Sequence, residues 1–299
     1  MRRPIAVLMA AALFVAACGG GGSGATTAPP PSGFPREIAG ITITEPPVRI
    51  ISGSPTHTEI LFAIGAGGAV VAVDAFSDYP AEADDLPHLD AFNPSVEGFA
   101  ALDPDLVIVT FDPNDLVGGL GALGIPVLVL DAPATTEGVY KQMAEIGVIV
   151  GHGDGATALI DRMRSEIAEI VAGLPEAVEP LDYYHELDPT LFSIGSDTFL
   201  GSLYAMLGMA SIADAAGGGY PQLSAEFVIA ADPDFVFLGD STCCAQSLET
   251  VAARPGWDSL SAVSGGRVIA LDEALASRWG PRIVDLLGVI ADAVYGEDR

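Results

Sequence analysis

A fifteen-residue segment of this chain occurs twice, 129 positions apart, and this duplication constrains the fold more than any other feature. The first copy, residues 95–109, reads SVEGFAALDPDLVIV, and the second, residues 224–238, reads SAEFVIAADPDFVFL. Each copy predicts a short helix, a Pro-Asp turn and a buried strand. The duplication therefore predicts a molecule with two equivalent halves.

A serine followed two residues later by a glutamate opens each copy. Ser95 and Ser224 are good helix N-caps, which places Glu97 and Glu226 in the first helical turn, where the helix dipole and free amides favour an anion. Any well-capped helix shows the same pattern. Because the pattern recurs in register, we favour a paired role for the two carboxylates, one on each half.

The N-terminal residues have the layout of a secretory signal, with two arginines, an apolar run over 5–15 and then small residues. The sequence VAAC at 15–18 resembles the bacterial lipobox, which predicts a signal peptide over 1–17, lipid attachment at Cys18 and an extracytoplasmic chain anchored to the cell membrane. An ordinary signal with an incidental cysteine is the alternative. Residues 18–37 predict a flexible tether rich in Gly and Pro.

The chain is strongly acidic, with a formal net charge of −28 over 299 residues. Such a surface repels phosphate backbones, so nucleic acid is excluded as a partner. The roughly 260 residues that follow the tether are enough for two lobes, each with its own core.

Two adjacent cysteines, Cys243 and Cys244, are the only ones besides Cys18. They predict either a vicinal disulfide, strained because neighbouring Cα atoms are about 3.8 Å apart, or two buried thiols. A zinc set would need further cysteines that the chain lacks.

Short apolar strands alternate with amphipathic helices, which predicts parallel sheets covered by helices on both faces. The expected strands are 49–52, 70–74, 106–110, 127–130, 183–187, 191–194, 235–238 and 268–271. Between the halves, residues 156–174 keep a three-and-four apolar spacing that predicts one long helix. The prediction is an α/β fold of two Rossmann-like lobes, 38–150 and 176–299, joined by a connecting helix over 151–175, which permits only modest rocking.

Several segments resemble, in order and spacing, the helical-backbone class of substrate-binding proteins that serve ABC importers. They are SPTHTE at 54–59, SDYP at 77–80, the two repeat copies, YPQLSAE at 220–226 and GPRI at 280–283. The class includes receptors for vitamin B12, haem, ferric siderophores and zinc or manganese, and the likeness is greatest to the vitamin B12 receptors. The resemblance implies a monomeric solute-binding protein, in the periplasm or on the outer cell surface, that delivers a small-molecule ligand to a permease dimer.

The resemblance also assigns roles to individual residues. One glutamate on each lobe of such proteins pairs with arginines of the two permease subunits, and these positions match Glu97 and Glu226. The positions that match the ligand cleft between the lobes are Ser54, Tyr79, Phe92, Phe111, Phe192, Tyr220, Arg278 and Trp279. For any single aromatic residue among them, ordinary core packing is the alternative.

The resemblance leaves the ligand open. Phe92 and Tyr220 stand where vitamin B12 receptors have tryptophans. Anionic ferric siderophores commonly need several cations, and this chain has one lysine and few arginines near the expected cleft, of which Arg278 is best placed and Arg254 weaker. These features favour cobalamin or another corrinoid over a siderophore, while haem could take His or Tyr as axial ligands.

Direct binding of zinc or manganese would need about three histidines and a carboxylate around one ion. Of the four histidines, His57 and His185 are the weak candidates, whereas His88 and His152 fall in positions typical of solvated side chains. No metal or other cofactor is therefore expected to reside in the protein.

An enzyme is not expected. The sequence SGSP at 52–55 lacks the glycines that flank the serine of a nucleophile elbow on both sides at two-residue spacing, and no Walker-type phosphate loop occurs. A surface adhesin without a small-molecule ligand is the alternative from a different class.

Overall fold

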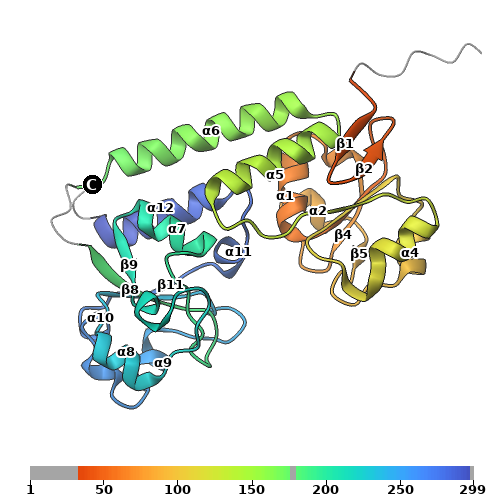
Figure 1. Ribbon diagram of the computed structural model, residues 1–299. Helices are drawn as coiled ribbons and strands as arrows, with labels where there is room; N and C mark the ends of the chain where they lie inside the picture. The colour runs from red at the N-terminus through yellow and green to blue at the C-terminus, as the bar shows by residue number, and fades with distance from the viewer. Residues whose placement is uncertain (1–32, 176–179, 297–299) are drawn as a thin grey trace, which may run out of the picture.

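The computed structural model describes residues 33–175 and 180–296, so the predicted signal peptide, Cys18 and most of the tether lie outside the described residues. The described chain forms two separate sheets in which all neighbouring strands are parallel, together with a small antiparallel hairpin (Figure 1). The predicted α/β fold of two lobes with mainly parallel sheets is therefore confirmed.

The N-terminal sheet has the strand order β5-β4-β3-β6-β7. Its strands are β3 (Ile50–Gly53), β4 (Val70–Asp74), β5 (His88–Leu89), β6 (Leu106–Val109) and β7 (Val127–Val129). The connections contain α1 (Pro55–Ala63), η1 (Gly67–Ala69), α2 (Ala81–Asp84), α3 (Val96–Ala100), η2 (Pro113–Asp115) and α4 (Leu116–Ala122). The hairpin of β1 (Arg36–Ile38) and β2 (Ile41–Ile43) precedes the sheet and includes Arg36 and Glu37, the last two residues of the predicted tether.

The C-terminal sheet has the strand order β11-β10-β8-β9. Its strands are β8 (Leu181–Glu186), β9 (Met209–Ser211), β10 (Phe235–Leu238) and β11 (Val268–Ala270). The helices of this part are α7 (Phe199–Met206), η3 (Ile212–Ala216), α8 (Ala225–Ala231), α9 (Leu248–Ala252), η4 (Trp257–Ser259), α10 (Ser261–Ser264), α11 (Glu273–Ala276) and α12 (Ile283–Tyr295).

One predicted strand, 191–194, is wrong. Leu191 has a φ of 70°, in the left-handed region that a strand cannot contain, and Phe192 forms only an isolated antiparallel bridge with Gln222. The strand next to β8 is instead β9, whose three residues carry too short a pattern to be recognised from the sequence.

The duplicated segments fold alike, as α3 with β6 and as α8 with β10. Ser95 and Ser224 each accept a hydrogen bond at 3.1 Å from the backbone N–H three residues ahead. Asp105 and Asp234 each accept one from a backbone N–H at the start of the neighbouring strand, at 2.9 Å and 3.0 Å. All residues of β6 and β10 are buried, as their unbroken apolar runs predict for central parallel strands.

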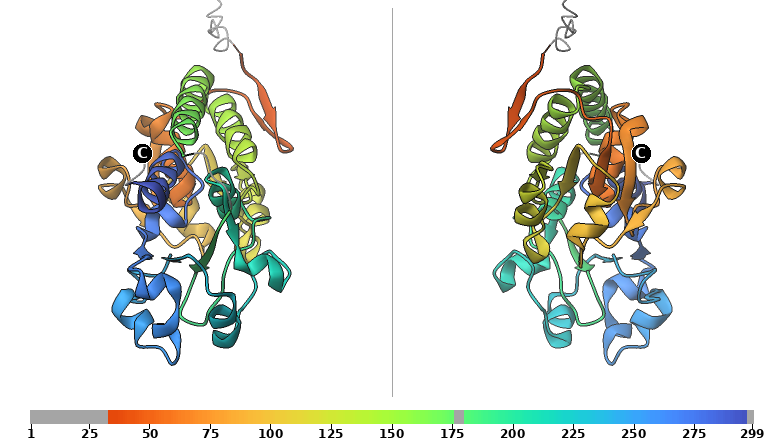
Figure 2. Two further views of the ribbon diagram at one scale, coloured as in Figure 1. Left: turned by 90° about the vertical axis from the view of Figure 1, so that its left-hand side faces the viewer. Right: turned by 90° about the vertical axis from the view of Figure 1, so that its right-hand side faces the viewer.

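The two sheets are joined by α6 (Gly153–Ala172), the predicted long helix, which spans about 30 Å. Its buried face packs beside α5 (Thr136–Ile149) and on α12 (Figure 2). One hydrophobic cluster runs through these helices and includes residues of both sheets, among them Val73 and Phe237. Because this core is continuous, large relative motions of the two lobes would disrupt packed side chains.

The close approach of α6 to α1 depends on Gly155. A Cβ added there would clash with the backbone carbonyl oxygen of Ile64. We expect Gly155→Ala to lower the free energy of unfolding by about 2 kcal/mol, because overpacking outweighs the helix propensity of alanine. Gly153→Ala in the same helix is the control, since nothing lies within 4 Å of its added Cβ. Urea unfolding of both variants measures the difference, and equal stabilities would contradict the expectation.

Among the described residues, no helix combines the length and the apolar character that crossing a membrane requires.

Candidate functional site

A large chamber of about 1250 Å³ lies where the carboxyl ends of the two sheets face each other. Ser54, Asp74 and Thr110 line it from the ends of β3, β4 and β6, and Thr242 and Asp272 line it from the segments after β10 and β11. Open α/β sheets bind ligands at this edge because the loops there are free to vary. The volume exceeds the roughly 300–1,000 Å³ of ordinary small-molecule pockets, which favours a large ligand.

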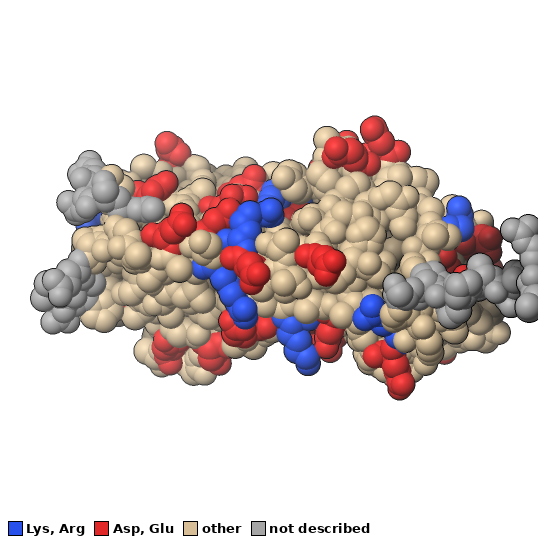
Figure 3. Space-filling view, turned by 90° about the horizontal axis from the view of Figure 1, so that it is seen from above, with Lys and Arg blue, Asp and Glu red and all other residues tan. Residues whose placement is uncertain are grey.

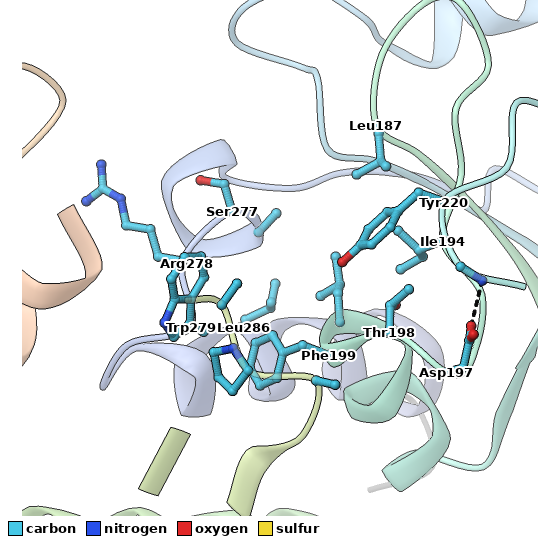
Figure 4. Close-up of a pocket in the computed structure, with 16 residues that line it drawn as sticks. Leu187, Ile194, Asp197, Thr198, Phe199, Tyr220, Ser277, Arg278, Trp279 and Leu286 are labelled. Atoms are coloured by element: carbon cyan, nitrogen blue, oxygen red, sulfur yellow. Dashed lines mark hydrogen bonds between the residues drawn. The ribbon is translucent and has the colours of Figure 1, made fainter. Parts of the chain in front are cut away.

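A smaller chamber of about 530 Å³ adjoins the large one and shares Ser277, Arg278 and Trp279 with it. Figure 4 shows Tyr220 and Phe199 on its walls, while the guanidinium of Arg278 points away from Tyr220. The lining is mostly apolar. The chamber could therefore accept an apolar part of a ligand but offers few partners to a charged one.

Three phenylalanines form an aromatic wall on the N-terminal side of the large chamber. Phe76, Phe92 and Phe111 are 63%, 57% and 43% exposed. The ring centroids of Phe76 and Phe92 are 6.0 Å apart, and those of Phe92 and Phe111 are 5.7 Å apart. Exposed contiguous apolar surface in a concave site indicates a binding partner. Sequence reasoning missed Phe76, although its position two residues after β4 was a usable signal.

The structure brings together six of the eight predicted cleft residues. Ser54, Phe92 and Phe111 line the large chamber, Tyr220 lines the small one, and Arg278 and Trp279 line both. Tyr79 and Phe192 line neither chamber. The ring of Tyr79 instead packs under the guanidinium of Arg282, 4.3 Å from the ring centroid, and the backbone of Phe192 is held by its bridge to Gln222.

Arg278 belongs to an ion-pair cluster centred on Glu59 of α1, so it is not a free cation in the cleft. Arg278 donates to Glu59 Oε1 at 2.9 Å and to Asp78 at 2.7 Å, and Arg282 donates to both Glu59 oxygens at 2.6 Å and 3.0 Å. Although partial burial works against it, the contact with Arg278 holds the pKa of Asp78 below its usual range. The guanidinium of Arg278 is therefore already neutralised.

The other arginine considered for the cleft, Arg254, is committed to the interior of the C-terminal lobe and lines neither chamber. It donates to both carboxylate oxygens of the fully buried Glu186, at 2.5 Å and 2.6 Å, and stacks on Trp257. Asp240 is buried beside this pair with both oxygens unpartnered, and burial raises its pKa to about 7. The interpretation of Arg254 as a ligand-facing cation is wrong.

The two histidines considered for a metal site do not meet around one ion. His57 lies in α1 and His185 in β8, both fully buried, and the Nδ1 atom of His185 is 2.9 Å from the hydroxyl of Tyr204. Within residues 33–175 and 180–296, no group of three or more His, Cys, Asp or Glu side chains is placed to hold a metal ion. Burial lowers the pKa of His57 to about 4 and that of His185 to about 3, so both are neutral core residues near pH 7.

A buried neutral histidine makes stability depend on pH. Below about pH 6.5 the unfolded chain protonates His57 while the folded chain does not, so the free energy of unfolding falls as the pH drops towards 4, by about 3 kcal/mol for this residue. We expect His57→Gln to flatten the plot of unfolding free energy against pH between 4.5 and 6. Asp240 changes the pH dependence of stability in the opposite direction, but it does so equally in the original protein and in His57→Gln. Parallel plots of unfolding free energy against pH for these two proteins would contradict the expectation.

No disulfide joins Cys243 and Cys244 in the structure, and their sulfur atoms lie 2.6 Å apart. Cys243 is exposed, so the prediction of two buried thiols is wrong. Its backbone N–H donates to Glu273 Oε2 at 2.9 Å, which ties the loop after β10 to the rim of the large chamber. A vicinal disulfide stays a prediction.

Glu97 and Glu226 lie in the first turns of α3 and α8, as predicted, and both side chains are exposed. Ser95 Oγ lies 3.1 Å from Glu97 Oε2. Neither glutamate forms a salt bridge within the described part of the chain, so both carboxylates are available to a partner.

Comparison with known proteins connects this geometry to a family. The sequence model of the periplasmic binding protein family matches residues 50–275. A cobalamin-binding protein of Halobacterium salinarum is 30% identical over 269 residues, 85% of this chain and 71% of that protein. An uncharacterised ABC transporter substrate-binding lipoprotein of Bacillus subtilis is 29% identical, over 85% and 82% of the two chains. The apo periplasmic haem-binding protein of Roseiflexus sp. RS-1 has a TM-score of 0.75 at 26% identity, over 84% and 99% of the two chains.

Proposed function

This chain belongs to the periplasmic binding protein family, and we propose that it is the lipid-anchored receptor of an ABC importer that captures a corrinoid such as cobalamin. The ligand occupies the large chamber and is delivered to the permease dimer without covalent chemistry. Cys18 carries the lipid that keeps the receptor at the outer face of the membrane. One observation carries the proposal: a chamber of about 1250 Å³ opens between the two sheets, with an exposed wall of three phenylalanines.

The choice of a corrinoid rests on size and charge. A corrinoid is broad and flat, so the rings of Phe76, Phe92 and Phe111 can cover one of its faces. An anionic siderophore or the propionates of haem would need free cations. Among the described residues, the only Lys or Arg that lines either chamber is Arg278, which is already paired. The name of the relative from Halobacterium salinarum supports the same class of ligand.

Haem is the second candidate, because His88 lines the large chamber and Tyr220 lines the small one, and both side-chain types can ligate iron. The name of the Roseiflexus neighbour supports this candidate. A haem ligand would show itself through a Soret band that shifts when His88 is replaced by glutamine.

A thermal-shift panel on the full-length protein tests the proposal. The panel contains cobalamin, cobinamide, haem, several ferric siderophores and divalent cations. A ligand at 100 times its Kd stabilises the folded state by about 2.7 kcal/mol, which moves the melting midpoint by several degrees. We expect the corrinoids to give the largest shift. A shift with haem alone would favour the second candidate, and no shift with any compound would favour an adhesin.

The aromatic wall predicts the effect of a single substitution on affinity. Phe92 touches both other rings, so Phe92→Ala removes the middle of the wall. We expect the Kd for cobalamin, measured by isothermal titration calorimetry, to rise about tenfold to a hundredfold. Leu123→Ala is the control, since Leu123 is a similarly exposed apolar side chain that lines neither chamber. Equal affinities of the two variants would contradict a role for the wall.

A further inference from the structure

The large chamber has an unbalanced charge. Its lining contains six carboxylates, those of Asp74, Asp78, Asp84, Asp90, Asp272 and Glu273. The one guanidinium in the lining, that of Arg278, is shared between Glu59 and Asp78. The ring nitrogens of His88 face the backbone carbonyls of Asp74 and Asp84, at 3.1 Å and 3.3 Å.

Four of these carboxylates have no described cation within salt-bridge distance, although Arg282 lies near enough to Asp272 for a weaker attraction. Asp90 accepts two backbone N–H bonds, and Asp74, Asp272 and Glu273 accept one each, all at 2.9–3.0 Å. Among the residues that the structure describes, none of the four forms a salt bridge with Lys, Arg or His. Asp74 and Asp90 belong to the N-terminal wall, and Asp272 and Glu273 belong to the opposite wall, so a ligand between the sheets lies between two acidic surfaces.

Asp74 is the clearest sign that a positive charge is missing. Its side chain is 1% exposed, its Oδ1 accepts the N–H of Phe76, and its Oδ2 has no hydrogen-bond partner although the residue lines the chamber. Burial, with a smaller contribution from Asp90, raises the pKa of this carboxyl, although the nearby backbone N–H groups of Phe76, Ala75 and Ala91 act in the opposite direction. A buried acceptor without a partner is unfavourable, and a cationic group of a ligand would compensate it.

The aromatic wall adds to the same preference. The faces of phenylalanine rings attract cations, and Phe76 and Phe92 each follow an aspartate, Asp74 and Asp90, by two residues in the same lining. Basic side chains are found elsewhere: Lys141, Arg162 and Arg164 lie on α5 and α6, and Figure 3, which views the molecule from the side of α6, shows Lys and Arg near the middle of that face. None of these three residues lines the chamber.

We infer that the chamber selects ligands of net positive charge, and that Asp74, Asp90, Asp272 and Glu273 determine this selectivity. A concave surface lined by one sign of charge concentrates the field and discriminates between ligands of equal shape. The inference rests on the proposed function, because it takes the chamber as the ligand site. It narrows the ligand to a cationic metal chelate, and among corrinoids to those with an added positive charge at the metal.

Three corrinoids of nearly equal shape test the inference. Cyanocobalamin is neutral, aquacobalamin carries one positive charge because water replaces cyanide on cobalt, and a monocarboxylic acid derivative carries one negative charge because one ring amide is hydrolysed. At low ionic strength we expect aquacobalamin to bind about tenfold more tightly than cyanocobalamin, and the acid about tenfold more weakly. Titration calorimetry on the full-length protein measures all three.

Matched variants assign the effect to the chamber. Asp90→Asn combined with Glu273→Gln keeps the acceptor oxygens but removes one charge from each wall, and it should reduce the tenfold preference to about twofold or threefold. Asp161→Asn combined with Asp258→Asn removes two exposed charges outside the chamber and should leave the tenfold preference for aquacobalamin unchanged. Asp74→Asn, which retains an oxygen for the N–H of Phe76, should act in the same direction as the chamber variant.

Each outcome decides a separate question. Equal binding of all three corrinoids would overturn the inference while the proposed function stands, and no binding of any corrinoid would overturn the proposed function. Because an imidazole could replace the cobalt-bound water, His88→Gln is measured as well. If His88→Gln abolishes the preference for aquacobalamin, coordination of cobalt explains it and the charge inference fails; if the preference persists, the charge inference is supported.

Discussion

Replacing Glu59 by glutamine is expected to lower the free energy of unfolding by about 3–5 kcal/mol, more than any other single change proposed for this protein. The side chain of Glu59 is 1% exposed and those of Arg278 and Arg282 are 9% and 18% exposed. Removing the carboxylate leaves two largely buried guanidinium groups without their common partner. For a protein of this size the melting midpoint should fall by roughly 10 °C, measured by calorimetry or circular dichroism.

Two further variants separate the charge from the packing. Asp78→Asn removes the other partner of Arg278, but that side chain is 63% exposed, so the expected loss is below about 1 kcal/mol. Replacing Arg278 and Arg282 by methionine in the Glu59→Gln background removes the uncompensated charges and should restore much of the stability. A loss in Glu59→Gln no larger than that in Asp78→Asn would contradict the central role of Glu59.

This cluster also explains what sequence reasoning could and could not establish. Arg278 lies near the cleft, as expected. Its ion pair with Glu59, however, joins residues 219 positions apart, and no local sequence pattern predicts such a pair. The same limit applies to Arg254, whose partner Glu186 is 68 positions away. Ion pairs between distant segments depend on tertiary structure, so composition alone overstated the number of arginines available to a ligand.

Local sequence signals predicted strands correctly where several of these signals agreed. The strands β6 and β10 were predicted because each is an unbroken apolar run after a Pro-Asp turn and a capped helix. The segment at 191–194 had three apolar residues but no supporting turn or cap signal, and the left-handed backbone of Leu191 prevents a strand there. At the site, the resemblance assigned Ser54, Phe92 and Phe111 to the cleft, and all three line the chamber. The rule that ligands lie beyond the carboxyl ends of strands, applied to every strand, would also have found Phe76.

Reversing the charges of Glu97 and Glu226 together is expected to reduce ligand uptake to background while leaving ligand affinity within about twofold of its original value. Both glutamates are exposed in the first turns of α3 and α8 and line neither chamber. In our proposal each one pairs with arginines of one permease subunit, so the Glu97→Lys/Glu226→Lys variant meets repulsion at both contacts. Uptake of labelled cobalamin by cells, together with calorimetry on the purified variant, measures the two effects.

Glu249→Lys provides the matched control, because Ser247 caps α9 and Glu249 follows it by two residues in the first turn, as in the duplicated segments. Reversing an exposed charge in the first turn weakens its interaction with the helix dipole only slightly in all three helices, too little to unfold the protein. If reversing the charge simply destabilises a capped helix, Glu249→Lys should lose uptake as well. Loss of uptake in the Glu97→Lys/Glu226→Lys variant but not in Glu249→Lys would therefore indicate a role in docking. Full uptake by the Glu97→Lys/Glu226→Lys protein would show that the repeated carboxylates cap helices and do nothing more.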